Sequence, residues 1–301
     1  MLVFFIEYCL YEILTAVMQK TIIDTVLIKQ SVIEIIEECS FVFPERVRAD
    51  FDRMLETESN SGAVETLKLL ALNAELAEKN RIPLCQDCGT VVVFLKIGQD
   101  VCLEGMFLED AINLGVEEAY RDFYLRKSIV SDPLKRQNTG TNTPAVVHVD
   151  IVRGNTVEII VYLKGGGSEN MTALKMFRPT APVEEIVDFI EESVVSSGSN
   201  ACPPFYLGIG IGGTADEALL NSKKAVLRDE PNADNYYTEL ELIIADRLSK
   251  TNIGPLGFGG ESTVAGVYIK PAPSHIASLP VAVNIGCHSM RYGKRILKGN
   301  I

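Results

Sequence analysis

Hydrophobic residues recur at helical spacing through the first third of the chain. From Ile22 to Glu38, apolar side chains return every three or four positions, which is the period of an amphipathic helix. Pro44 stands where a helix can begin and precedes a second expected helix that ends near Glu58. Residues 63–79 show the same period and predict a third helix. The front of the chain is therefore predicted to be helical.

Behind this first third, β-branched runs alternate with helical segments. The expected strands are residues 90–95, 145–152, 156–164, 205–211, 264–269 and 279–285. The expected helices are residues 109–127, 182–195, 216–227 and 238–250. The second and third strands are expected to pair as a hairpin, because Arg153-Gly154-Asn155 between them is typical of a turn. The pattern predicts the α+β class: a helical N-terminal third followed by mixed, largely antiparallel sheets flanked by helices.

The start of the chain differs from the rest. It opens with an apolar run, but Glu7 and Glu12 interrupt the run and no basic residue precedes Lys20. A signal peptide has a basic start, and a membrane span has about 20 uninterrupted apolar residues. Neither is predicted here. We expect residues 1–17 to be an N-terminal extension, with Met18 as the ordinary start, and residues 18–301 to form one domain.

Composition narrows the possible partners. The chain has 40 acidic and 28 basic residues and a net charge of −12, which argues against nucleic acid and anionic membrane surfaces as partners. An anionic substrate would need a local basic pocket. The seven cysteines are an odd number in a chain of this size, which favours a reducing, cytoplasmic setting over a disulfide framework.

Three of these cysteines lie in loops far apart in the sequence. Cys85, Cys202 and Cys287 each stand close to a proline or a glycine. Thiolates that a fold brings together can hold an iron–sulfur cluster. Three ligands in place of four would leave one iron open, and an open iron is a Lewis acid that can withdraw a hydroxyl group from a hydroxy acid. Three other cysteines, Cys9, Cys39 and Cys102, are interpreted as buried apolar residues.

Two glycine loops allow more than one interpretation. Residues 208–213 satisfy G-x-G-x-x-G after an expected strand and before an expected helix, as in a dinucleotide-binding oxidoreductase that takes NAD. No βαβ repeat surrounds them, which weakens that alternative. The second loop, residues 164–170, carries three consecutive glycines and opens a short helix. It is either an anion site for a carboxylate or a tight turn.

Five ordered motifs together resemble one known family. They are Cys85-Gln86-Asp87-x-Gly89-Thr90, Asn138-Thr139-Gly140-x-Asn142-x-Pro144-Ala145, Gly165-Gly166-Gly167-Ser168-Glu169-Asn170, Cys202-Pro203-Pro204 and Gly208-x-Gly210-x-Gly212-Gly213-Thr214. The chain is similar to the class I, iron–sulfur fumarate hydratases and to the related L(+)-tartrate dehydratase α subunits. The resemblance runs from about residue 18 to 301, so that this span is expected to be the catalytic domain.

The resemblance implies a cofactor and a set of site residues. It implies a [4Fe–4S] cluster whose iron is held by Cys85, Cys202 and Cys287. It places substrate binding at Gln86, Arg126 and Gly167, and proton transfer at Asp87 and His275. The chain departs from the family at Cys88, where threonine is usual, and the role of that thiol is left open.

The resemblance also implies an activity and partners. The expected reaction is the reversible hydration of fumarate to (S)-malate, with L(+)-tartrate or mesaconate as alternative substrates. In single-chain members of the family the general base lies in a C-terminal domain, so a separate fumarate hydratase β-type subunit is expected, together with an α–α dimer contact. A non-enzymatic iron–sulfur scaffold is the alternative from another class. It would need the cysteines but not Asp87, Arg126 and His275.

Overall fold

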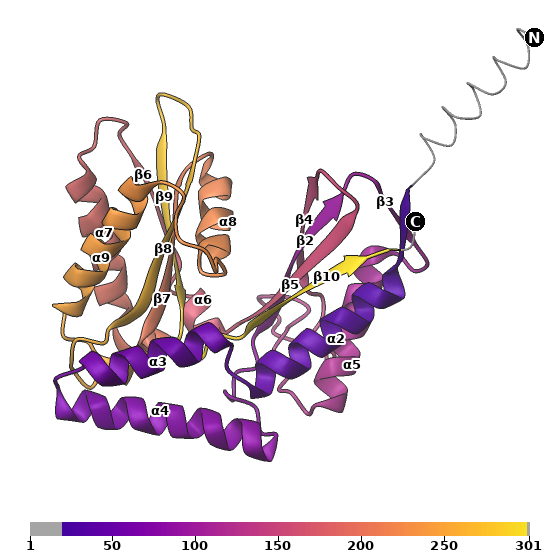
Figure 1. Ribbon diagram of the computed structural model, residues 1–301, viewed down its shortest axis with the longest axis horizontal. Helices are drawn as coiled ribbons and strands as arrows, with labels where there is room; N and C mark the ends of the chain where they lie inside the picture. The colour runs from indigo at the N-terminus through magenta and orange to yellow at the C-terminus, as the bar shows by residue number, and fades with distance from the viewer. Residues whose placement is uncertain (1–19, 300–301) are drawn as a thin grey trace, which may run out of the picture. The chain divides into compact units, whose positions relative to one another are not determined.

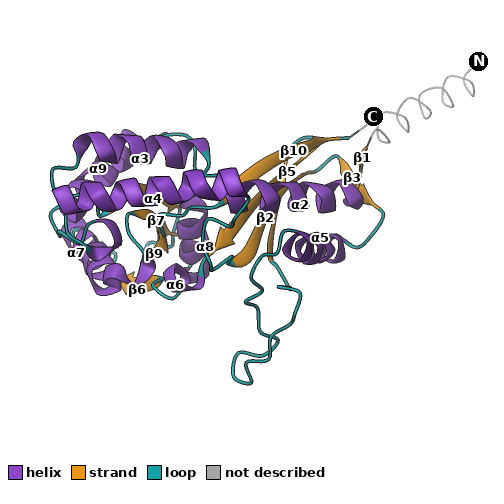
Figure 2. Ribbon diagram, turned by 90° about the horizontal axis from the view of Figure 1, so that it is seen from below, coloured by secondary structure: helices purple, strands orange, loops and turns teal. Residues whose placement is uncertain are grey.

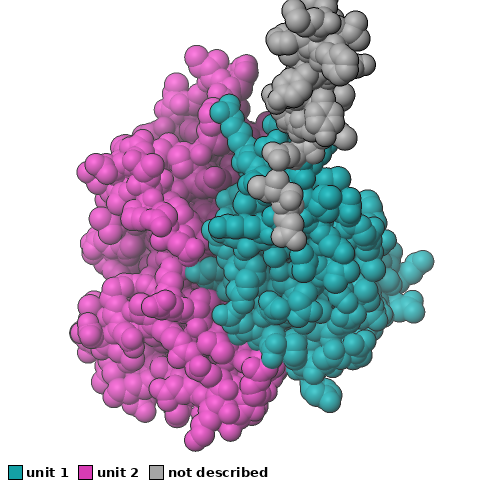
Figure 3. Space-filling view, turned by 45° about the vertical axis from the view of Figure 1, so that its right-hand side comes forward, with its two compact units in different colours: residues 1–39, 90–163, 292–301 teal, residues 40–89, 164–291 magenta. Residues whose placement is uncertain are grey.

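The computed structural model describes residues 20–299, which divide into two compact units (Figure 3). Unit 1 takes residues 20–39, 90–163 and 292–299, and unit 2 takes residues 40–89 and 164–291. Each unit is therefore assembled from separate stretches of the chain. The predicted extension over residues 1–17, with its start at Met18, lies outside the described residues. The expected domain over residues 18–301 comprises both units.

Unit 1 is built on a four-stranded sheet with two helices (Figure 1). Its strand order is β10-β5-β2-β4, with β2 at Thr90–Gly98, β4 at Val146–Val152, β5 at Thr156–Lys164 and β10 at Tyr292–Lys298. β2 and β4 run parallel, whereas β5 and β10 run antiparallel. A second, parallel pair joins β1 (Thr21–Asp24) to β3 (Val101–Glu104). The helices are α2 (Thr25–Phe41) and α5 (Leu108–Asp122).

Three predictions in this unit are wrong. The helix expected over residues 109–127 ends at Asp122, so the last five of these residues belong to the loop that follows it. The helix expected from Ile22 begins only at Thr25, because the residues before it pair with β3 as a strand. The Asp24 side chain then accepts a hydrogen bond from the Val26 amide at 2.9 Å, as a helix-capping residue does. The expected hairpin of β4 and β5 does not form either, since β2 lies between these strands in the sheet.

Unit 2 combines two helices from early in the chain with a second four-stranded sheet. The early helices are α3 (Glu45–Thr57) and α4 (Ser61–Asn80). The sheet has the order β6-β9-β7-β8, with β6 at Ala173–Phe177, β7 at Phe205–Gly212, β8 at Val264–Ala272 and β9 at Leu279–Gly286. The remaining helices are α6 (Gly166–Glu169), α7 (Val183–Ser197), α8 (Ala215–Ala225) and α9 (Asn235–Ser249), and 3-10 turns occur at Gly198–Ala201 and Pro255–Gly257.

Helices cover both faces of this sheet (Figure 1). On one face, Ile190 of α7 and Ile244 of α9 pack into a fully buried apolar cluster with Ile209 of β7. On the other face α8 comes very close to β7. A Cβ added at Gly208 or Gly210 would lie 2.0 Å from a carbonyl oxygen of α8. These glycines lie within a strand and permit close strand–helix packing, so they do not form the turn that a dinucleotide fingerprint requires.

The architecture agrees with the predicted class. The early helices and the mixed sheets flanked by helices confirm the α+β prediction. Within residues 20–299, no helix combines the length and the apolar character needed to cross a bilayer.

Candidate functional site

The topology of unit 2 brings two of the three candidate cysteines to one end of its sheet. Cys202 precedes β7 and Cys287 follows β9, and these strands run antiparallel with Tyr206 opposite Gly286. The backbone amide of His288 donates a hydrogen bond to the Cys202 carbonyl at 3.0 Å. The His288 ring nitrogen Nδ1 lies 3.2 Å from the same oxygen. The two cysteine-bearing segments are thus joined directly.

The third cysteine lies close to the other two. Partial desolvation raises the pKa of the Cys202 thiol, although the residue as a whole is exposed, and the neighbouring thiols of Cys287 and Cys85 raise it further. Burial also raises the pKa of Cys287, and Cys85 again contributes in the same direction. Like charges disfavour each other's ionisation only at short range. Loops far apart in the sequence therefore place three thiols within electrostatic reach of one another.

Asp87 attaches the Cys85 loop to the glycine turn, by which we mean residues 165–170 including α6. Its Oδ2 accepts a hydrogen bond from the Gly166 amide at 2.7 Å, and its Oδ1 accepts one from Gly89 at 3.0 Å. The Gly166 amide thus binds a carboxylate of the protein itself, and the interpretation of the three glycines as an anion site stays a prediction. Gln86, next to Asp87, is exposed.

Two buried cations lie near Cys287, and sequence reasoning missed both. Lys164 ends β5 with 1% of its surface exposed, and Arg291 is 2% exposed. Burial lowers the pKa of Lys164 to about 8, although the charges of Glu169 and Cys287 act in the opposite direction. The positive charge of Arg291 lowers the pKa of Cys287 and so opposes the effect of burial on that thiol. The sequence signal that could have indicated a buried lysine was the position of Lys164 between an apolar strand and three glycines.

Cys202 and Cys88 differ in a way that bears on ligand choice. Cys202 is exposed and has a left-handed backbone with φ of 55°, a conformation that costs a non-glycine residue roughly 1–3 kcal/mol and is concentrated at functional sites. Cys88 is buried, and its Sγ lies 3.8 Å from the Cys85 carbonyl oxygen. The thiol of Cys88 is therefore directed toward its own loop.

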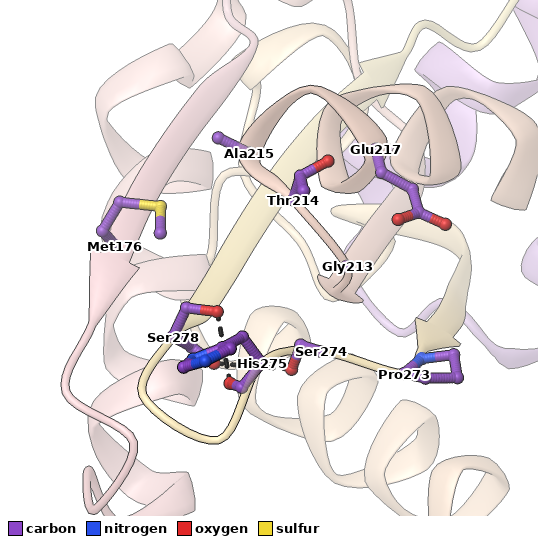
Figure 4. A pocket seen from close by; sticks show the side chains of 9 residues that line it. All are labelled: Met176, Gly213, Thr214, Ala215, Glu217, Pro273, Ser274, His275 and Ser278. Atoms are coloured by element: carbon purple, nitrogen blue, oxygen red, sulfur yellow. Dashed lines mark hydrogen bonds between the residues drawn. The ribbon is translucent and has the colours of Figure 1, made fainter.

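His275 lies at the opposite end of the same sheet. It belongs to the loop between β8 and β9, whereas Cys287 follows β9. Because β9 has eight residues, its ends are separated by roughly 23 Å at about 3.3 Å per residue. Figure 4 shows His275 beside a pocket of about 450 Å³ that Thr214 and Glu217 also line. Within one chain, the structure does not bring His275 to the cysteines.

Arg126 belongs to unit 1, in the exposed loop that follows α5 (Figure 2). Two asparagines of the second motif hold the residues beside it. Asn138 donates to the Lys127 carbonyl at 3.0 Å, and the fully buried Asn142 accepts from the Ser128 amide at 2.7 Å. The motif therefore has a structural function, which is to shape the segment that carries Arg126.

A single metal ion and a multi-iron cluster need different arrangements of ligands. Within the described part of the chain, no group of three or more His, Cys, Asp or Glu side chains is arranged to hold one metal ion. The ligands of a multi-iron cluster bind different iron atoms, so they need not converge on one point. The three neighbouring thiols are compatible with such a set of ligands. The buried cations beside them would offset the negative charge of the thiolates.

Comparison with known proteins agrees with the resemblance seen in the motifs. The model of the family described as Fumarate hydratase (Fumerase) matches residues 29–295. A Methanocaldococcus jannaschii protein, provisionally named L(+)-tartrate dehydratase subunit alpha, is 38% identical over 90% of this chain and 98% of its own length. The L(+)-tartrate dehydratase subunit alpha of Escherichia coli O157:H7 is 32% identical over 84% of this chain and 90% of its own.

These matches define the class of the protein as a hydro-lyase. The chain belongs to the fumarate hydratase (Fumerase) family, whose model covers most of its length.

Proposed function

We propose that the chain is the α-type subunit of a hydro-lyase that hydrates fumarate reversibly to (S)-malate with a [4Fe–4S] cluster. The observation that carries this proposal is the grouping of Cys85, Cys202 and Cys287 at one end of the sheet of unit 2. When bound, the cluster supplies Lewis-acid chemistry at an iron without a protein ligand. The remaining steps belong to the residues of the protein.

Asp87 is proposed to transfer a proton to and from the hydroxyl group of the substrate. Asp87 is the second residue after Cys85. The amides of Gly166 and Gly89 hold its carboxylate by hydrogen bonds, so that its position is defined before substrate binds. Gln86 and the backbone of Gly167 are proposed to bind the carboxylates of the substrate. Arg126 is proposed to share this function, because a guanidinium can hold a carboxylate with two parallel hydrogen bonds.

His275 is proposed to act in the site of a neighbouring copy of the chain. The length of β9 separates it from the cysteines of its own chain, yet the family resemblance assigns it to proton transfer. Both statements hold together if the expected α–α contact brings the loop between β8 and β9 to the partner's cysteines. The exposure of residues 273–277 is compatible with such a contact.

A β-type subunit is proposed to supply what the assigned residues lack. None of the residues assigned above is a base for the carbon-bound proton. The relatives that this chain matches along 90% or more of their length are named as alpha subunits. The proposed functional unit is therefore a hetero-oligomer of α and β chains. A cytoplasmic location stays a prediction.

L(+)-tartrate is the second candidate substrate. The names of the relatives favour it. Tartrate differs from malate by one hydroxyl group and mesaconate differs from fumarate by one methyl group, and a few contacts decide between such substrates.

The test is anaerobic co-expression of this chain with a β-type subunit, followed by kinetics on the three dicarboxylates. We expect fumarate to give the highest kcat/KM of the three, and the isolated α chain to be inactive with its cluster loaded. A higher kcat/KM for tartrate would make tartrate the substrate and leave the assignment as a hydro-lyase unchanged. A loaded complex that turns over none of the three would favour the non-enzymatic scaffold.

A further inference from the structure

The glycine turn contacts all three segments that carry the candidate cysteines. Its Gly166 amide donates to Asp87, two residues after Cys85. A Cβ added at Gly167 would lie 3.2 Å from the carbonyl oxygen of Asn200, two residues before Cys202. α6 also packs against β9, the strand that leads to Cys287. The turn is therefore a common support for three loops that are distant in the sequence.

Lys164 makes the connection to the third segment. Its ammonium donates to the carbonyl of Ile285, two residues before Cys287. It also donates to Ser168 Oγ within the glycine turn at 2.8 Å, and Ser168 donates on to the Gly165 carbonyl at 3.2 Å. One side chain thus joins the end of β9 to the turn.

The environment of Lys164 argues against a direct chemical function. The side chain is 1% exposed, and its nitrogen lies 3.7 Å from Glu169 Oε2 besides its two acceptors. Burying an ammonium group costs several kcal/mol unless it is paired and hydrogen-bonded. These partners hold the nitrogen inside the protein and away from solvent. What the side chain can do from there is hold backbone segments in register.

We propose that Lys164 is a positioning residue for the iron–sulfur cluster, fixing the Cys287 segment against the glycine turn so that the third thiol stands in register with the other two. This inference rests on the cluster of the proposed function. It concerns how firmly the chain holds the cluster, and not a proton transfer during turnover.

Lys223 offers a matched control. It extends from α8 to the same carboxylate, with Nζ 2.6 Å from Glu169 Oε1, and it is 19% exposed. Replacing it with methionine removes the same charge from the neighbourhood of Glu169 and leaves the contacts of Lys164 with Ser168 and Ile285 in place. The two substitutions therefore separate the loss of a charge from the loss of the connection between β9 and the turn.

The experiment compares Lys164→Met and Lys223→Met with the unchanged chain after anaerobic reconstitution with ferrous iron and sulfide. The readouts are iron per chain, visible circular dichroism of the cluster, and the rate of iron release to a chelator well below the melting temperature. Loss of a residue that orients metal ligands typically weakens metal binding 10- to 100-fold. We expect K164M to release iron faster by about that factor and to show altered visible dichroism, whereas K223M resembles the unchanged chain.

A release rate for K164M equal to that of the unchanged chain would overturn the inference. So would equal acceleration in K164M and K223M, since charge alone would then explain the effect. If K164M does not fold by far-ultraviolet dichroism, Ser168→Ala decides, because it removes one acceptor and leaves the lysine. Faster release in S168A supports the inference, and an unchanged rate overturns it. An unchanged chain that takes up no cluster would overturn the proposed function itself.

Discussion

The two ends of the sheet in unit 2 are built on different principles. At the end where β7 begins and β9 ends, hydrogen bonds join segments from distant parts of the chain, as between Asp87 and Gly166 or His288 and Cys202. At the other end, His275 bonds with Ala277 and Ser278 of its own loop. The first end includes fully buried cations, whereas the second is exposed.

The difference between the two ends of the sheet indicates that they have different functions. The cysteine end is fixed by bonds that exist only in the folded unit, as expected for groups that must hold a cofactor in one geometry. The histidine end depends on a short exposed loop, as expected for a surface completed by another chain. Each prediction below tests one side of this contrast.

The largest expected effect is loss of the cluster at the cysteine end. Cys85→Ser, Cys202→Ser and Cys287→Ser should each abolish the loading of about four irons per chain, because a hydroxyl is a poor replacement for a thiolate ligand. Iron analysis and visible absorption after anaerobic purification check this. Cys88→Ser is the control from the same loop and should load normally, since its thiol is directed toward the Cys85 carbonyl. Normal iron in any of the first three variants would show that the ligands are wrongly assigned.

Asp87 and His275 compare the two ends directly. Asp87→Asn and His275→Asn should each retain iron and lower kcat by roughly 10²–10⁴, the usual effect of losing a proton-transfer group. If His275 serves the neighbouring copy, mixing the two inactive variants should restore about a quarter of the sites, since half of the randomly formed dimers then contain one intact site. Co-expression with two affinity tags, followed by kinetics, measures this. No restoration after mixing would contradict the exchange between copies.

Lys164 predicts a pH dependence of stability for the metal-free chain. Its pKa is lowered from 10.5 to about 8 by burial, so that between these pH values the unfolded chain binds more protons than the folded one. The free energy of unfolding should therefore rise with pH across this window, by about 3 kcal/mol in total. The cost of the buried charge is greatest below pH 8 and disappears above 10.5.

The measurement is denaturant unfolding of the unchanged chain and of Lys164→Met at several pH values. The difference between the two free energies isolates Lys164, because other groups that titrate in this window are common to both chains. Lys223→Met provides the baseline for removing an ammonium beside Glu169. A difference that stays flat with pH would mean that folding does not lower the pKa of Lys164.

The smallest expected effect concerns Arg126 in unit 1. Arg126→Lys should raise KM about tenfold with little change in iron content, because a point charge loses one of two charge-assisted hydrogen bonds, each worth roughly 1.5–3 kcal/mol. Arg121→Lys is the matched control, since Arg121 already pairs with its neighbour Asp122 at 2.7 Å. Equal KM values for the two variants would remove Arg126 from the substrate-binding residues.

The sequence predicted the helices of unit 2 well because their signals are local. Pro44 precedes α3, and apolar residues recur at helical spacing along α4. Strand partners are decided by contacts distant in the chain, so the pairing of β1 with β3 was not visible and the hairpin of β4 and β5 was wrong. Gly210 shows the limit of a local motif. The spacing of the glycines around it matches a nucleotide-binding loop, but Gly210 lacks a side chain because α8 packs closely against its strand.

The candidate site was predictable to the extent that its motifs are. The three cysteines, Asp87 and the glycine turn could be chosen from the sequence, and the structure brings them together. The distance of His275 from them depends on the direction and length of β9, which no motif encodes. The burial of Lys164 depends on how the glycine turn packs against the same strand. Sequence therefore identified the residue types, and topology determined which of them meet.

The position of β9 has a consequence for biosynthesis. This strand lies between β6 and β7, although it is the last of the four strands in the sequence. Ribosomes add about 5–20 residues per second, so Cys287 follows Cys202 out of the ribosome after an interval on the order of ten seconds. During that interval the sheet lacks an inner strand and the site lacks its third thiol. Iron delivered so early would meet two ligands and an open edge. If the proposed ligands are correct, insertion of β9 sets the earliest moment at which this chain could take up its cluster.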